Sequence, residues 1–343
     1  MTKAMLEIVN PGMMASIQDL GRFGYQAKGV PTSGALDFVN LRLANRLVGN
    51  EEGQGALEFR IMGPTIRVLA DSVRIALTGT EAVIELMEPV AKRVPSYQSV
   101  SLQKGALFKV GVTADTAVAY LAVEGGFDVP DVYASQSTYM SGGFGGFEGR
   151  ALQVGDLLPL ALASVPDRHE QVCDAPLLLD STDPIRVVPG PQKDYFSKAG
   201  LKTFFSESYV ISGDSNRMGS RLEGAPVAHE KGADINSDGI VTGAIQVPGN
   251  GLPIVLLADH QTTGGYPKIG CVASADLPRL GRMKPGCALT FASVTVAQAE
   301  KARRLLEQQL AQSIAAFKAV PSEQAQFWNH LAECNLIDGV VGS

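Results

Sequence analysis

Short apolar runs separated by turns dominate the first half of this 343-residue chain. Glycines and Asp-containing turns lie between the runs, and the 37 glycines and 19 prolines are spread along the whole chain. This spacing is typical of an all-β barrel or sandwich rather than of long helices. Strands are therefore expected at residues 6–9, 66–69, 73–77, 83–86, 98–102, 106–112 and 117–123.

The second half repeats features of the first half in the same order. An apolar run followed by Gly-Gly-aromatic occurs at residues 118–127 and again at 254–266, and Gly-Arg followed by an apolar run occurs from residue 149 and from residue 281. The segment at 33–47 has a shorter counterpart at 212–222. The repetition predicts two related β-domains with a site in the groove between them.

Length and local composition suggest where these domains begin and end. The chain exceeds the usual size of one domain, and its polar, proline-containing stretch at 164–182 is the best linker. The predicted fold is mainly β. It has an N-terminal domain over 1–165, a linker over 166–184, a second domain over 185–295 and a helical tail over 296–343.

Helices are expected in only a few places. Apolar spacing predicts one over residues 35–47, with Ser33 as its N-cap and Gly49 as its stop. A second is expected over 297–319, and a short third helix over 322–334 carries Trp328. The apolar face of the second helix is predicted to include Ala302, Leu305, Leu306, Leu310, Ile314 and Phe317.

The densest polar cluster follows a predicted buried strand at 253–258. Asp259 to Tyr266 crowds donors, acceptors and two glycines at the end of that strand. Buried polar groups must be hydrogen-bonded, so these side chains either satisfy one another in a tight turn or face a ligand. The sequence leaves both interpretations open.

Two arginines in Gly-rich loops have a similar ambiguity. Arg22 lies close to Gln18 and Asp19, so it either forms a structural ion pair or offers a planar fork to a carboxylate or phosphate. Arg217 either pairs with Glu223 or Asp214 or, like Arg22, lies at a site.

Several classes of protein are excluded or disfavoured. The net charge of −6 and the absence of a Lys/Arg cluster argue against nucleic-acid binding. Apolar stretches are too short to span a membrane, the N-terminus lacks a signal-peptide core, and four cysteines show no CxxC spacing, so a cytoplasmic protein is expected. There is no P-loop, and Glu148 replaces the third glycine of a dinucleotide fingerprint, so residues 141–150 are interpreted as a mobile loop or lid.

Seven ordered segments between residues 6 and 294 carry a family resemblance. They are SIQDLGRFGYQAKGVPTSGALD, LANRLVGN, LEFRIMGP, YLAVEGGFDVP, SNRMGSRLEG, GAIQVPGNGLPIVLLADHQTTGGYPKIG and ADLPRLGRMKPG. The chain resembles the biotin-dependent carboxyltransferase / allophanate hydrolase subunit 2 family, and within it the branch formed by the C subunits of 5-oxoprolinase (KipA-like). The resemblance implies two cyclophilin-like β-barrels.

It also implies a function and partners. The implied activity is that of one subunit of an ATP-dependent 5-oxoprolinase, which converts 5-oxo-L-proline, ATP and water to glutamate, ADP and phosphate. The implied partners are a KipI-like B subunit (PxpB) and a LamB/YcsF-type A subunit (PxpA), with Mg and K ions as further candidates. The alternatives are a carboxyltransferase subunit for urea or another amide, with biotin supplied in trans, and a non-catalytic regulator that binds a kinase inhibitor.

Opening a lactam by this route requires cations for carboxylate and phosphoryl oxygens, donors for an oxyanion and a base for water. The catalytic candidates are Asp259, His260 and Thr263. No metal site is predicted from the sequence. The candidates for substrate binding are Gln18, Arg22, Asn216, Arg217, Gln246, Gln261, Thr262, Gly264, Gly265 and Tyr266.

Overall fold

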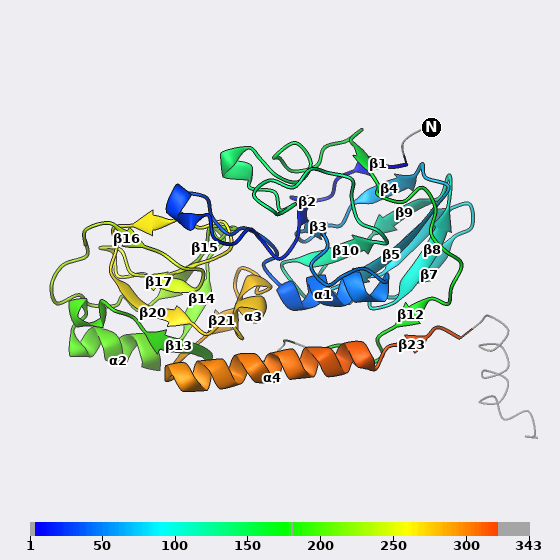
Figure 1. Ribbon diagram of the computed structural model, residues 1–343. Helices are drawn as coiled ribbons and strands as arrows, with labels where there is room; N and C mark the ends of the chain where they lie inside the picture. Colours follow the sequence, from blue (N-terminus) through cyan, green and yellow to red (C-terminus); the bar gives the residue numbers. More distant parts are fainter. Residues whose placement is uncertain (1–3, 178, 180, 322–343) are drawn as a thin grey trace, which may run out of the picture.

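The computed structural model describes residues 4–177, 179 and 181–321. It consists of two β lobes side by side, with the long helix α4 (Val296–Ala315) running beneath both (Figure 1). The prediction of a mainly β fold with two β-domains and a helical tail is therefore confirmed.

Two antiparallel sheets form the N-terminal lobe. The six-stranded sheet has the order β11-β1-β4-β9-β6-β7, and the five-stranded sheet has the order β2-β3-β10-β5-β8. A single core of buried aliphatic and aromatic side chains, including Phe59 and Phe108, fills the space between them. The strands are β1 (Met5–Asn10), β2 (Ser16–Gln18), β3 (Ala56–Phe59), β4 (Thr65–Val68), β5 (Ser72–Thr78), β6 (Ile84–Glu88), β7 (Lys92–Val94), β8 (Ser99–Gln103), β9 (Leu107–Val110), β10 (Ala119–Val123) and β11 (Leu157–Pro159).

Strand β10 is buried on both faces, which explains why its sequence is a continuous apolar run. All five of its residues are buried. Leu121 belongs to the core between the two sheets, whereas Tyr120 belongs to the core beneath α1 (Phe38–Leu47). A strand covered on both faces has no need for alternating polar residues.

Helix α1 begins later than the sequence suggested. Its N-cap is Asp37, whose carboxylate accepts hydrogen bonds from the backbone N–H groups of Val39 and Asn40. The prediction of Ser33 as the cap is wrong, because residue 33 lies five residues before the first helical residue and has a left-handed φ of 54°. Gly49 follows the helix end with a φ of 82°, a conformation that glycine adopts at low cost.

The C-terminal lobe is built on an eight-stranded sheet in the order β21-β14-β15-β18-β17-β20-β13-β22. Phe204 stacks on Phe291 with ring centroids 4.5 Å apart in its core. The strands are β13 (Ile185–Pro189), β14 (Tyr209–Ile211), β15 (Gly219–Gly224), β17 (Ala244–Gln246), β18 (Ile254–Leu256), β20 (Lys268–Val272), β21 (Ala288–Leu289) and β22 (Phe291–Ser293). A separate two-stranded sheet pairs β16 (Asp238–Gly239) antiparallel with β19 (Thr263–Gly264).

Short helical segments complete the two lobes. The sequence did not predict α2 or α3. These segments are η1 (Gln26–Lys28), η2 (Met140–Gly142), η3 (Lys193–Tyr195), α2 (Lys198–Ser206) and α3 (Leu277–Gly281).

The two lobes share one hydrophobic core. Leu41 and Tyr120 of the first lobe lie in the same buried cluster as Ile185 and Val255 of the second. The segment between the lobes also forms a strand, because β12 (Gln171–Val172) pairs with β23 (Lys318–Ala319) after α4. The predicted domain boundaries stay predictions.

Helix α4 begins with a capping box formed by Thr295 and Gln298, and it packs on α1. Ala302, Leu306 and Leu310 are buried as predicted, but Leu305 is 51% exposed and does not belong to the buried face. The predicted helix over 322–334, with Trp328, lies outside the described residues. No helix in the described part of the chain is long and apolar enough to cross a membrane.

Candidate functional site

A buried charged cluster joins the two lobes around Arg217. Its Nε donates to Asp259 Oδ2 at 2.8 Å and its Nη2 to Asp259 Oδ1 at 3.1 Å. Its Nη1 donates to Glu58, which lies on β3 of the other lobe. Arg217 therefore binds Asp259 and Glu58, rather than Glu223 or Asp214 as the sequence suggested.

Further contacts complete this cluster. Arg217 Nη2 also donates to the Gly34 carbonyl at 2.6 Å and to Gln18 Oε1 at 3.3 Å. The Tyr120 hydroxyl donates to Glu58 Oε2 at 2.6 Å. Burial alone would lower the pKa of Arg217, but Asp259 and Glu58 raise it above its ordinary value. The guanidinium stays charged and is held by protein groups.

Arg22 lies next to this cluster and has donor capacity left. It is 1% exposed, donates to the carbonyls of Ser137 and Val132, and lies over the Phe144 ring at 5.1 Å. Its Nη1 has no hydrogen-bond partner among the described residues. Burial lowers the pKa of Arg22, while the charges of Asp19 and Asp259 raise it.

The Asp19 carboxylate binds Ser135 and Gln136 rather than Arg22. Its carboxylate accepts hydrogen bonds from Ser135 Oγ at 2.8 Å and from the Gln136 N–H at 2.7 Å. It thereby ties the loop after β2 to residues 135–137 and leaves the Arg22 fork to carbonyl groups.

Arg60 is a further cation in this region. Its Nη1 donates to the Ser215 carbonyl at 3.5 Å, and its Nε has no partner within the part of the chain that the structure describes. Burial lowers the pKa of Arg60, Glu58 raises it, and Arg217 lowers it further. Buried N–H groups of arginine are normally hydrogen-bonded, so the free donors of Arg22 and Arg60 suit an oxyanion such as a carboxylate or phosphoryl group.

His260 lies directly after Asp259 and is fully buried. Its Nδ1 is 2.6 Å from the Gln261 carbonyl, to which it donates, so Nε2 accepts from Thr242 Oγ1 at 3.2 Å. Burial lowers its pKa from the ordinary value of 6.5. The ring is a neutral imidazole at neutral pH, which is the form that a general base requires.

Residues 262–266 of the polar strand-end cluster lie nearer the surface than Asp259 and His260. Thr263 and Gly264 pair with Asp238 and Gly239 in the two-stranded β16–β19 sheet, and the Thr262 carbonyl accepts from the Ile240 N–H at 3.0 Å. Several of the predicted side chains here are exposed: Asn216, Gln261, Thr263 and Tyr266.

Gln246 lies next to Gly264 of this two-stranded sheet and is buried. Its Nε2 has no partner in residues 4–177, 179 and 181–321, and a Cβ placed on Gly264 would come within 2.5 Å of that nitrogen. The absence of a side chain at Gly264 therefore makes room for Gln246.

The structure thus brings Gln18, Arg217 and Asp259 into one network beside Arg22. It places Thr262, Thr263, Gly264, Gly265 and Tyr266 on and around the two-stranded β16–β19 sheet at the surface. Sequence reasoning missed Glu58, Arg60 and Thr242. The signal for Glu58 was present: a carboxylate inside the apolar run 56–59 of a buried strand needs a partner.

Known proteins resemble this chain over most of its length. The family model for the carboxyltransferase domain, subdomain A and B, matches residues 28–293. The C subunit of 5-oxoprolinase from Escherichia coli is 37% identical over 300 residues, which is 88% of this chain and 94% of that protein.

Larger proteins contain a similar region. The urea amidolyase of Saccharomyces cerevisiae is 33% identical over 89% of this chain but only 17% of its own length. The crystal structure of the Kluyveromyces lactis urea carboxylase aligns with a TM-score of 0.83 at 29% identity, over 91% of this chain and 29% of that chain. This chain belongs to the carboxyltransferase domain family, subdomain A and B, and shares its two-lobed β fold.

Proposed function

We propose that this chain is the C subunit of a multi-subunit, ATP-dependent 5-oxoprolinase. The observation that carries the proposal is the 37% identity to the Escherichia coli C subunit of 5-oxoprolinase, which extends over 94% of that protein. A second such subunit, from Haemophilus influenzae, is 35% identical over the same share of its length.

The charged cluster supplies groups that suit a small cyclic amide bearing a carboxylate. Arg22 Nη1 and Arg60 Nε, which have no hydrogen-bond partner among the described residues, are the proposed donors for the carboxylate, since Arg217 is already held by Asp259 and Glu58. Neutral His260 is the candidate base for water, with Gln261 and Thr242 fixing its tautomer.

The proposed reaction needs further subunits. ATP is a co-substrate of the assembled enzyme, and the partners are the KipI-like B subunit and the LamB/YcsF-type A subunit. This chain contributes the amide-binding surface between its lobes, in a cytoplasmic complex.

Reconstitution tests this proposal. The chain is combined with purified B-type and A-type subunits, and glutamate and phosphate are measured with 5-oxoproline and ATP present. Turnover that requires all the subunits is expected. Turnover by this chain alone, with contaminating subunits excluded by mass spectrometry, contradicts the multi-subunit assignment.

A biotin-dependent urea or amide carboxylase is the second candidate. The structural match to a urea carboxylase at a TM-score of 0.83 favours it. The distinguishing assay supplies carboxylated biotin and urea in place of 5-oxoproline and ATP. Carboxyl transfer without lactam hydrolysis would replace the first proposal with this one.

A further inference from the structure

A cavity directly beside the charged cluster forms a second candidate site. A cavity of about 330 Å³ opens between the loop before α1, the start of α1, the end of β18 and helix α4. Its apolar walls include Leu20, Leu36, Phe38, Leu257 and Leu277. This volume is at the lower end of the range for small-molecule pockets, so it suits a compact ligand.

Ser33 is the unusual polar group in this cavity. It lines the cavity, is 4% exposed, and its hydroxyl has no hydrogen-bond partner in the described chain. Its backbone has a φ of 54°, in the left-handed region that residues other than Gly, Asn and Asp rarely adopt. A buried hydroxyl without a partner and an unfavourable backbone conformation both oppose folding, and such features concentrate at ligand sites.

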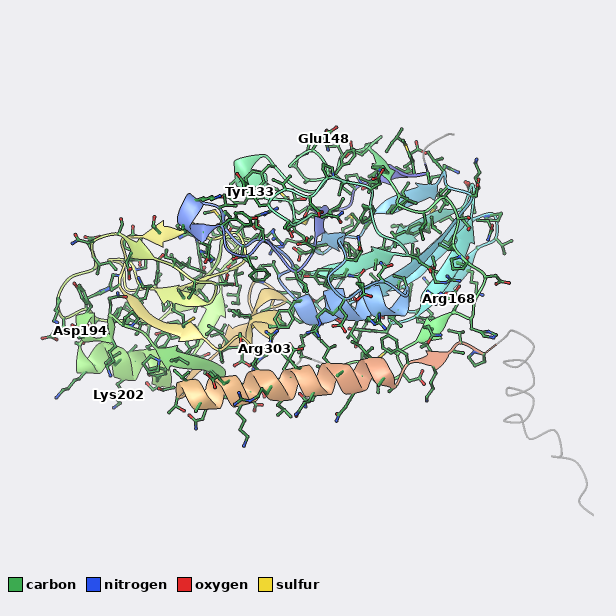
Figure 2. The ribbon with its side chains drawn as sticks, viewed as in Figure 1. Tyr133, Glu148, Arg168, Asp194, Lys202 and Arg303 are labelled. Carbon is green, nitrogen blue, oxygen red and sulfur yellow. The ribbon has the colours of Figure 1, made fainter. Side chains whose placement is uncertain are left out.

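The charges in the cavity wall are already compensated. Arg42 Nη1 donates to Glu307 at 2.8 Å and Arg42 Nε also binds Glu52. Arg303, which Figure 2 labels on α4, has its Nη2 2.7 Å from Glu307 Oε1 and lies over the Phe38 ring at 4.3 Å. Two guanidinium groups face two carboxylates, so this wall favours neither an anion nor a cation.

We propose that this cavity binds a compact, uncharged and mostly apolar molecule whose amide or hydroxyl group hydrogen-bonds to Ser33 Oγ. The apolar walls take the body of the ligand, and Ser33 can either donate to it or accept from it. Thr242, which also lines the cavity and bonds to His260, is the second polar group.

The site is joined to the charged cluster through the backbone. The Ser33 N–H donates to the Ala258 carbonyl at 2.9 Å. The next residue in each of these two segments belongs to the cluster: the Gly34 carbonyl accepts from Arg217 Nη2, and the Asp259 carboxylate binds Arg217. A ligand against Ser33 therefore rests on the segment that positions Arg217.

Benzamide and benzoate are matched probes for this site, since they have the same shape and differ in charge. Their binding to the full chain is measured by calorimetry and by ligand-observed NMR. We expect saturable binding of benzamide and at least tenfold weaker binding of benzoate. Absence of saturable benzamide binding up to about 10 mM, or equal binding of benzoate, overturns the proposal.

Variants locate the binding. Ser33→Ala is expected to weaken benzamide about threefold to tenfold, the effect of one hydrogen bond, and Ala35→Leu to abolish binding by filling the cavity. Ser101→Ala on β8 is the matched control, with wild-type affinity. Ser33→Gly is a second variant without the Ser33 hydroxyl. It keeps the proposal testable should Ala35→Leu fail to fold. Wild-type affinity in both hydroxyl-deleted variants contradicts the assignment, and none of these measurements depends on turnover.

Discussion

Arg217 and Asp259 bind each other through two hydrogen bonds, Nε to Oδ2 at 2.8 Å and Nη2 to Oδ1 at 3.1 Å. This fork-to-fork geometry is the strongest arrangement that the two side chains can adopt. Because Arg217 also binds Glu58 of the opposite lobe, the pair is part of the contact that holds the lobes together. Asp259 therefore has a structural role. The sequence around Asp259 did not indicate this role, because its partner Arg217 lies 42 residues away in the chain.

Breaking the Arg217–Asp259 pair is expected to destabilise the fold. Asp259→Asn removes one charge from a buried network and is expected to lower the free energy of unfolding by about 1–3 kcal/mol. Denaturant titration measures this change. Asp214→Asn, an exposed change on the adjacent loop, is the control and is expected to have no measurable effect. Equal stability of the two variants would show that the Asp259–Arg217 pair does not support the fold.

Thr263→Val tests whether the polar cluster at Asp259 to Tyr266 lines the active site. Unlike Asp259→Asn, it removes no buried charge. Thr263 is exposed, so the substitution is expected to change stability by no more than about 0.5 kcal/mol. If Thr263 supplies a donor to an oxyanion, turnover of the reconstituted complex falls about 10²-fold. Unchanged turnover removes Thr263 from the site.

Arg22→Lys tests the carboxylate donors. Lysine keeps the charge but loses the planar fork, and the unpartnered Nη1 disappears with it. We expect KM for 5-oxoproline to rise about tenfold, with a smaller change in kcat, because uniform binding is lost. Steady-state kinetics of the complex measures both constants. Arg93→Lys, at a residue with a 77% exposed side chain, is the control; a similar rise in KM there would contradict the role of Arg22.

His260 makes stability depend on pH in a defined direction. Burial lowers its pKa in the folded state from 6.5, so the unfolded chain binds a proton more readily. Its contribution is fully present above pH 6.5 and is lost as the pH falls toward the lowered folded pKa, by up to about 1.4 kcal/mol per pH unit.

Denaturant titrations between pH 7 and pH 5 measure this dependence. His260→Gln is expected to flatten the slope, whereas His169→Gln, at a position outside the buried core, leaves it unchanged. A slope that is the same in the wild type and His260→Gln would mean that other groups cause it.

Two adjacent leucines on α4 provide a matched pair. Leu306 is 7% exposed and packs on α1, whereas Leu305 is 51% exposed. Leu306→Ala is expected to lower the free energy of unfolding by about 2–5 kcal/mol through the lost burial and the cavity left behind. Leu305→Ala is expected to have an effect of less than about 0.5 kcal/mol. The opposite ranking in thermal or denaturant unfolding would contradict the orientation of the helix.

Most of the secondary structure could be predicted from local sequence. Strands β5 and β8 differ from their predicted ranges of 73–77 and 98–102 by one residue at each end. Apolar runs bounded by turn residues carry this information locally, so no distant contact is needed to interpret them. The family could also be identified, because its segments occur in order along the chain.

Tertiary structure alone decided how the charges pair. Glu58 and Arg217 are 159 residues apart, and no local pattern relates them. The sequence offered Glu223 and Asp214 as nearby partners, but Glu223 instead accepts from Ser212, and Arg217 is directed into the other lobe. The physical reason is that a buried cation must be paired with carboxylates that are close in space, whatever their distance along the chain. The packing of the two lobes brings Glu58 and Asp259 next to Arg217.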